Sequence, residues 1–250
     1  YTSKAFTINS VSTMAHVVQG WIEWAEGNLQ ALCNSMKSAL QIEPNNSDAI
    51  FGLLEIYLYA GKATQTLPVA DKLLEIDPLT PLTHIMKGSF YTDSGIEEGL
   101  SYFERAYYMD SDSPVTKWML ASAYFWCGKN ETGYPLVDSL EKNLPDWAYT
   151  RQLLFLKKGL QGDRQQALAY ATDDLATEAK SDYHFAFHLA ECYAVINEKE
   201  KALDMLEYTT TIFFPYRFFQ KNILFENIRK EKRFEVLIEV CKKKSETFVI

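Results

Sequence analysis

The chain has 250 residues, of which 47% are hydrophobic and 23% are charged, and it carries a formal net charge of −8. This composition is typical of a folded globular protein and not of a disordered one. The negative charge argues against nucleic acid and anionic membranes as partners of this region, because both attract basic surfaces. The longest uncharged stretch, residues 5–22, contains several polar side chains and is not expected to span a membrane.

In chain order, six helix-breaking residues recur at nearly constant spacing. They are Gly27, Gly61, Gly95, Gly128, Gly162 and Asn197, separated by 34, 34, 33, 34 and 35 residues. A period of this length predicts an array of helix-turn-helix units. Glycine, and asparagine after it, accepts the positive φ of a sharp turn that follows a helix. We therefore predict units at residues 13–46, 47–80, 81–113, 114–147, 148–182 and 183–216.

The two ends of the chain lack this pattern. We interpret residues 1–12 as a lead-in or linker and residues 217–250 as capping helices, with short amphipathic helices expected at 223–228 and 234–240. The last unit of an array needs its hydrophobic face covered, which favours a capping role for this tail. Because the sequence begins with Tyr1 and not with Met, we expect a fragment or a processed product.

Other positions recur in register with the turns. Small residues stand seven positions before most turns, where they allow two helices to approach closely. Tyrosine stands four positions before four of the turns, and proline closes the second helix of the first two units because it cannot continue a helix. The small residues are Gly20, Gly88, Ala121 and Ala190, the tyrosines are Tyr57, Tyr91, Tyr124 and Tyr193, and the prolines are Pro44 and Pro78.

These registered positions resemble the tetratricopeptide-repeat family over roughly residues 13–216, and the unit at 148–182 is the weakest match. The resemblance implies an all-α fold: a right-handed α-solenoid of about six helix-turn-helix units with a C-terminal helical cap. The tail pattern from Phe225 to Leu237 is similar, more loosely, to the ending of such arrays in bacterial multidomain signalling proteins. In those proteins the array follows an adenylyl cyclase, a kinase, a DNA-binding domain or a β-propeller.

In arrays of this family the first helix of each unit lines a concave groove. The resemblance places ten residues there: Val17, Trp21, Trp24, Phe51, Tyr59, Trp118, Phe125, Trp126, Tyr149 and Phe187. Aromatic side chains dominate binding hot spots, so these residues indicate a protein or peptide ligand in the groove. The alternative is core packing, because an error of one residue in the register turns a side chain by about 100°.

One activity of the family is not expected here. Members that bind the C-terminal carboxylate of chaperones use Lys, Asn and Arg in the groove, and a carboxylate needs such donors. The corresponding positions in this chain are Val17, Trp21, Phe51, Glu55, Ile85 and Ser89. The predicted groove is therefore apolar and somewhat acidic, which suits an amphipathic helix, an extended apolar segment or another protein domain.

His184, His188 and Glu191 form a weak candidate metal site. The two histidines stand four residues apart, so both imidazoles lie on one face of a helix. The stretch lacks the Glu after the first His that marks metalloprotease helices, and packing is favoured over metal binding. We therefore expect no cofactor. The sequence also lacks a P-loop, a dinucleotide-binding turn, a nucleophile elbow and a kinase signature, so we expect no enzymatic activity.

Four cysteines are isolated from one another in the sequence: Cys33, Cys127, Cys192 and Cys241. None forms a CxxC pair, and a disulfide framework normally shows closer and clustered spacing. We expect reduced thiols and hence a cytoplasmic location, where thiols stay reduced.

These observations favour a non-enzymatic scaffold for protein–protein interaction, within a larger regulatory protein. A partner protein or peptide is expected to bind in the aromatic-lined groove. The alternative is a ligand- or peptide-sensing domain that controls an attached cyclase, kinase or DNA-binding domain, because small rotations between units accumulate into a change of curvature. A third hypothesis is self-association through the end units.

Overall fold

The structure is a computed structural model that describes residues 12–92 and 95–249. Every regular element in these two ranges is a helix, as the sequence predicts. The proposed lead-in at 1–12 lies outside the described residues except for Ser12, whose side chain caps the first described helix by accepting a hydrogen bond from the Ala15 amide at 3.3 Å. None of the described helices is long and apolar enough to cross a membrane.

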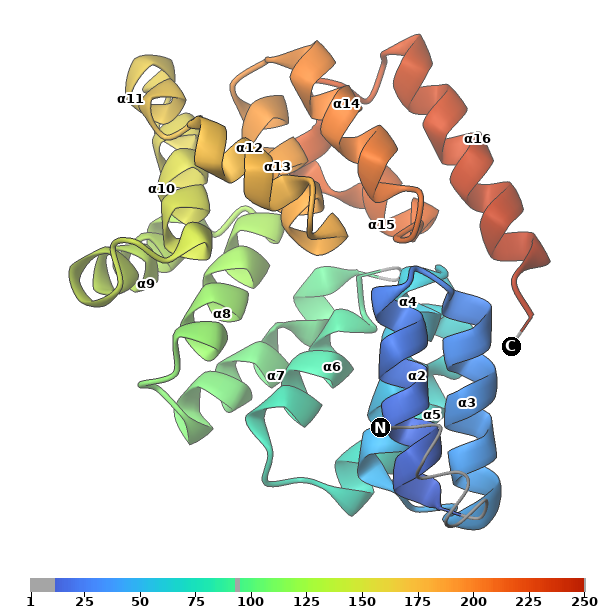
Figure 1. The fold of residues 1–250 in the computed structure, drawn as a ribbon. Coiled ribbons are helices and arrows are strands. Elements are labelled where there is room, and N and C mark those ends of the chain that lie inside the picture. The colour runs from blue at the N-terminus through green and yellow to red at the C-terminus, as the bar shows by residue number, and fades with distance from the viewer. Residues whose placement is uncertain (1–11, 93–94, 250) are drawn as a thin grey trace.

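Most helices are paired with the next one along the chain (Figure 1). The pairs are α2 (Thr13–Ala25) with α3 (Leu29–Ile42), α4 (Ser47–Tyr59) with α5 (Ala63–Ile76), α6 (Pro81–Ser89) with α7 (Ile96–Met109), α8 (Pro114–Trp126) with α9 (Asn130–Asn143), α10 (Ala148–Leu160) with α11 (Arg164–Ala169), and α13 (Tyr183–Val195) with α14 (Lys199–Thr209). The remaining elements are α12 (Asp173–Ala179), α15 (Tyr216–Lys221), the short 3-10 helix η1 (Ile223–Phe225) and α16 (Lys232–Thr247).

The recurring small residues lie where the two helices of a pair touch. A Cβ atom added to Gly20 would come within 2.8 Å of Met36 in α3, and one added to Gly88 would come within 2.7 Å of Phe103 in α7. A larger side chain at either position would push the helices apart. The spacing found in the sequence therefore reflects close helix–helix contact within these two pairs.

Five of the six turn residues have the predicted left-handed backbone. Gly27, Gly61, Gly128 and Gly162 have φ between 67° and 80°, and Asn197 has φ of 61°. Gly95 differs, because its φ of 170° is extended backbone and it serves as the N-cap of α7. In this unit α6 already ends at Ser89, whereas the other first helices end two residues before their turn residue.

The weakest repeat, at 148–182, has an interrupted second helix. The segment that corresponds to one helix elsewhere is divided into α11 and α12, with a break at residues 170–172. Asp173 and Asp174 stand in the first turn of α12, where carboxylates favour a helix N-terminus. Asp174 also forms an ion pair with Arg151 of α10, so it is held at the surface.

After α14 the chain turns back across the inner side of the curved array. We call residues 212–225, which include α15 and η1, the inner segment. Its Phe213 ring lies 4.9 Å from Tyr59 of α4, and its Phe218 ring lies 5.2 Å from Trp126 of α8. Phe219 stacks on Phe187 of α13 at 5.6 Å. The inner segment thus packs against the first helices of three different units.

The C-terminal helix α16 then returns to the first hairpins (Figure 1). The Ser245 hydroxyl donates a hydrogen bond to the carbonyl oxygen of Gly61 at 3.4 Å, and the Gln30 amide donates one to that of Val249 at 3.3 Å. The tail therefore does more than cover the last unit. It joins the end of the array to its beginning.

Candidate binding groove

The inner segment buries part of the predicted groove. Trp126 and Phe187 are only 6% and 1% exposed, because Phe218 and Phe219 lie against them. The prediction that these two residues face an open groove is therefore wrong. They do lie on the concave side, but the chain covers that part of the surface with its own aromatic residues.

Two other predicted groove residues are buried for a different reason. Phe125 is fully buried and packs against Gly133 of α9, where an added Cβ would come within 2.6 Å of the Phe125 ring. Val17 is 3% exposed and belongs to the core. Both side chains point into the array and not into the groove. Adjacent residues on a helix differ by about 100° in direction, which is how Phe125 and Trp126 come to lie on different sides.

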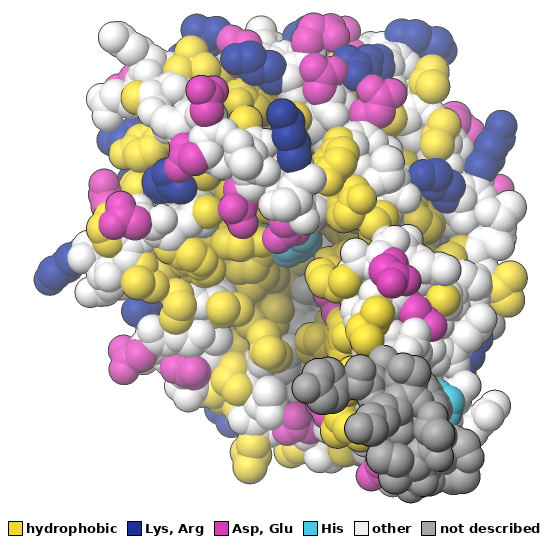
Figure 2. Space-filling model, in the orientation of Figure 1, with side chains coloured by type: hydrophobic (Ala, Val, Ile, Leu, Met, Phe, Trp, Pro, Cys, Tyr) yellow, Lys and Arg dark blue, Asp and Glu magenta, His cyan; other side chains and the backbone are white. Residues whose placement is uncertain are grey.

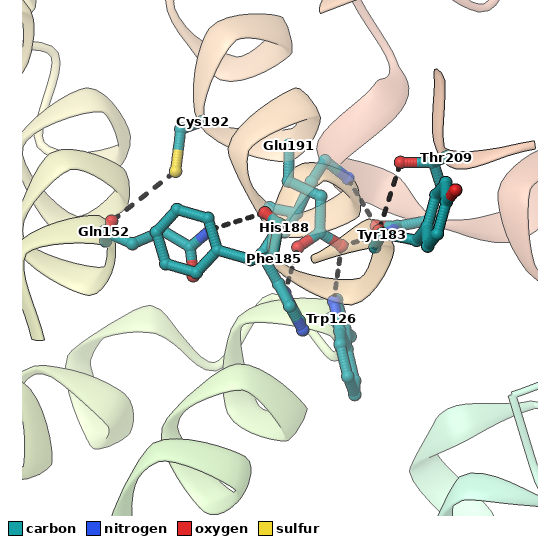
Figure 3. A network of polar contacts seen from close by, with 10 residues as sticks. Trp126, Gln152, Tyr183, Phe185, His188, Glu191, Cys192 and Thr209 are labelled. Carbon is teal, nitrogen blue, oxygen red and sulfur yellow. Dashed lines mark hydrogen bonds and ion pairs between the residues drawn. The ribbon is translucent and has the colours of Figure 1, made fainter. Parts of the chain in front are cut away.

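The Glu191 carboxylate is the centre of a buried polar network (Figure 3). Its Oε1 accepts hydrogen bonds from Trp126 Nε1 at 2.7 Å and from Asn222 Nδ2 at 2.6 Å. Its Oε2 lies 2.8 Å from His188 Nδ1. Trp126 comes from α8, His188 and Glu191 come from α13, and Asn222 belongs to the inner segment. This network fastens the inner segment to the concave side.

The same contacts argue against a metal site at His184, His188 and Glu191. Both oxygens of Glu191 are already engaged, and the two imidazole rings lie nearly perpendicular at 4.8 Å. Burial, with the neighbouring His188, lowers the pKa of His184, so its ring stays neutral. In the part of the chain that the structure describes, no group of three or more His, Cys, Asp and Glu side chains is arranged to hold a metal ion.

A hollow remains open between α4, α6, α8 and α13 (Figure 2). Figure 2 shows hydrophobic side chains around it, with a histidine and acidic side chains along one border. It consists of two adjoining cavities of about 200 Å³ and 270 Å³, which share Tyr59 and His184; together we call them the open groove. The first is lined by Phe51, Glu55, Leu58, Tyr59, Leu82, Ile85, Met86, Ser89, Val115, Trp118, Met119 and His184. The second is lined by Trp24, Ala25, Tyr59, Ser181, Asp182, Tyr183, His184 and Ile212.

The predicted groove residues that reach the open groove are Trp24, Phe51, Tyr59 and Trp118. Trp24 is 38% exposed and Phe51 is half-buried, whereas Tyr59 and Trp118 are mostly buried and form the floor. Tyr149 lies against Trp118 at 4.4 Å and supports it from behind. Trp21 is half-buried and contacts Trp24 edge-on at 6.3 Å.

Two exposed apolar residues of this wall were not predicted from the sequence. Leu82 is 47% exposed and Val115 is 36% exposed, and both line the first cavity. Each follows a proline, Pro81 or Pro114, at the start of a first helix. That repeated Pro-apolar pair, 33 residues apart in the sequence, is the signal that could have identified them.

The open groove carries negative charge on two of its sides. Glu55 of α4 lines the first cavity and Asp182, the N-cap of α13, lines the second. Burial raises the pKa of Glu55 to about 7; a hydrogen bond with Tyr59 opposes this rise, and the nearby charge of Asp182 adds to it. The Tyr149 hydroxyl donates to Asp182 at 3.0 Å. Burial also raises the pKa of Tyr59 and of Tyr149 far above neutrality, so both hydroxyls keep their protons.

A larger hollow of about 750 Å³ lies along α16. Charged residues of both signs border it, including Lys232, Glu235, Glu239 and Lys243. Alternating charge of this kind is typical of a solvated helix surface. We therefore take the open groove, with its apolar wall and aromatic floor, as the candidate site.

Comparison with solved structures supports the same architecture. A tetratricopeptide-repeat protein from Parabacteroides merdae matches with a TM-score of 0.51 and 16% identity, covering 95% of this chain and 93% of its own. The type IV pilus biogenesis factor PilW matches with a TM-score of 0.55 and 13% identity, covering 90% and 98%. A chain of the APC/C hetero-tetramer Cut9-Hcn1 matches with a TM-score of 0.58 and 12% identity, covering 98% of this chain and 48% of that one.

Neither a protein-family model nor a curated protein matches the sequence. The helix pairs, their turns and the structural matches nevertheless agree. The chain has the tetratricopeptide-repeat fold, an all-α solenoid of helical repeats, and the prediction of this fold from the sequence is confirmed.

Proposed function

We propose that this chain is a scaffold for protein–protein interaction and that its open groove holds a segment of a partner protein. The observation that carries the proposal is the exposed apolar wall formed by Leu82 and Val115 beside the Trp118 floor. Apolar side chains gathered in a hollow, with aromatic residues beneath them, are typical of binding surfaces.

The open groove is divided into two small cavities, which favours a narrow ligand that places side chains in each. Cavities of about 200 Å³ and 270 Å³ are smaller than typical pockets for drug-sized molecules. They accept a few side chains of an extended peptide or of one helix face. Because the inner segment covers the concave side at Trp126 and Phe187, a whole folded domain would have less of this surface to contact.

The alternative of a sensor that acts through a change of curvature receives no support. Such a change needs the two ends of the array to move relative to each other. Here two residues of the tail contact the first hairpins: Ser245 is hydrogen-bonded to Gly61, and Val249 is hydrogen-bonded to Gln30. These contacts hold the ends together, so we retain the scaffold.

The test is selection of binding peptides from a displayed random library on the full chain, followed by affinity measurements with fluorescently labelled peptides. The double variant Leu82→Glu/Val115→Glu places carboxylates in the apolar wall and should weaken binding about tenfold or more. Both sites lie in the first turn of a helix, where Glu is favourable for folding.

Leu79→Glu is the matched control, because Leu79 is 80% exposed and lies outside both cavities. It should bind the selected peptides like the wild type. If the double variant also binds them like the wild type, the open groove is not the binding site and the proposal fails.

A further inference from the structure

Two carboxylates face the open groove without a cation to balance them. The carboxylate of Asp182 accepts hydrogen bonds from the backbone amides of His184 and Phe185 and from the Tyr149 hydroxyl. Glu55 is hydrogen-bonded by Tyr59. None of the ion pairs described among residues 12–92 and 95–249 includes either carboxylate. The groove therefore has an excess of negative charge.

Two carboxylates at junctions between helices are paired with lysines of the chain. Where a first helix packs on the preceding second helix, Lys87 pairs with Asp71 at 2.5 Å, and Lys157 pairs with Asp138. At these two junctions the chain supplies the cation, whereas in the open groove no described residue does. Because a half-buried carboxylate such as Glu55 is unfavourable without a partner, the open groove suits a cation supplied from outside.

The walls of the groove suit an organic cation. Tyr59 and Trp118 form the floor of the first cavity, and Trp24 borders the second. Aromatic faces attract ammonium and guanidinium groups. Leu82, Met86 and Val115 offer apolar surface for the methylene groups that carry such a cation. A free metal ion would gain nothing from the apolar side chains of Leu82 and Val115, because they offer it no ligand atoms.

We propose that the open groove selects a partner segment in which a lysine or arginine is flanked by apolar residues, and that the cationic group binds between Glu55 and Asp182. This inference rests on the proposed function, because it names the chemistry of the segment that the groove holds. Apolar neighbours of the cation would cover Leu82 and Val115, while the charged end reaches the two carboxylates.

The peptides selected from the random library provide the test. We expect each groove-binding peptide to contain Lys or Arg next to apolar residues, and replacement of that residue by Gln to weaken binding about tenfold. In the protein, Glu55→Gln and Asp182→Asn should each weaken binding to a similar degree. Both variants keep the size of the side chain, and Asn also caps helices well.

Glu75→Gln is the control with the same change in net charge, because Glu75 is exposed and lines neither cavity. It should leave the affinity unchanged. Peptides that bind without Lys or Arg, but still lose affinity with Leu82→Glu/Val115→Glu, would overturn this inference and leave the proposed function in place. Equal affinity of that double variant and the wild type would overturn both this inference and the proposed function.

The dependence of affinity on pH gives a second readout. Affinity for the cationic peptide should rise between about pH 6 and about pH 8 as Glu55 loses its proton. The other titratable groups near Glu55 are Tyr59, Asp182 and His184; Tyr59 keeps its proton in this range, and His184 stays neutral. Glu55→Gln should flatten the rise, and an unchanged slope would contradict the assignment.

Discussion

At the scale of single residues, Glu55 shows how a binding surface can lower the stability of the fold. Its pKa is raised from 4.5 to about 7, chiefly by burial. Between these two values the unfolded chain has lost the proton and the folded chain keeps it, so stability falls as pH rises through this window. Above about pH 7 the full destabilisation is present.

We therefore predict that Glu55→Gln stabilises the protein, and more at about pH 8 than at about pH 5. The expected gain at the higher pH is between about 1 and 3 kcal/mol, because Gln needs no ionisation. Chemical unfolding at the two pH values measures it. A gain of equal size at both values would mean that ionisation of Glu55 is not the cause.

Gly61 and Gly162 allow a matched comparison of two turns. Both have positive φ, 67° and 80°, so alanine is strained at either site by about 1 kcal/mol. A Cβ at Gly61 would also lie 3.3 Å from the backbone of Phe214 and Pro215, whereas nothing lies within 4 Å at Gly162. We predict that Gly61→Ala destabilises the protein by about 1 kcal/mol more than Gly162→Ala does.

Equilibrium unfolding in denaturant compares the two variants directly. Equal losses would show that the inner segment does not press against the turn at Gly61. A larger loss at Gly162 would contradict the described packing at both sites.

At the scale of the elements, Asn222 is a buried polar anchor of the inner segment. Asn222 is 3% exposed, donates to Glu191, and accepts a hydrogen bond from the Leu224 amide at the start of η1. Asn222→Ala should destabilise the protein by about 2 kcal/mol, because the buried oxygen of Glu191 and the Leu224 amide each lose a partner. Thermal unfolding measures the loss.

Asn227→Ala is the control for this prediction. Asn227 donates to the carbonyl oxygen of Ala194 at 2.9 Å, but it is exposed, so water can replace the bond. Asn227→Ala should lower the free energy of unfolding by less than about 1 kcal/mol. If the two variants lose the same stability, the Glu191 network does not fasten the inner segment.

The elements also show what the sequence could and could not predict. The spacing of Gly27, Gly61 and Gly128 predicted the helix pairs, because the left-handed turn is a local requirement of the backbone. The role of Phe218 and Phe219 could not be predicted in this way. Which surface they cover depends on the curvature of the whole array, which is the sum of small rotations between units. For the same reason Trp126 was expected in an open groove and is buried.

At the scale of the whole molecule, the contact between α16 and the first hairpins makes distant units depend on each other. In an open array each unit contacts only its neighbours, so the loss of one end leaves the other end intact. We predict that removal of residues 232–250 lowers the protection of backbone amides in α4 and α5 against hydrogen exchange by about tenfold or more, although these helices are far away in the sequence.

The amides of α9 are the internal reference for this experiment, because α9 packs on α8 and α10 and not on α16. Their protection should change less than that of α4 and α5. Unchanged exchange in α4 and α5 would show that the contacts of Ser245 and Val249 add nothing to the stability of the first hairpins.

The hydrogen bond between Ser245 and Gly61 ties the position of α16 to the present number of repeats. Open arrays gain or lose units during evolution without disturbing the others, because each new unit only extends the row. In this chain an additional unit would carry α16 away from the first hairpins by one further step of the curve, and a missing unit would drive it into them. Duplication or deletion of a repeat is therefore expected to separate Ser245 from Gly61.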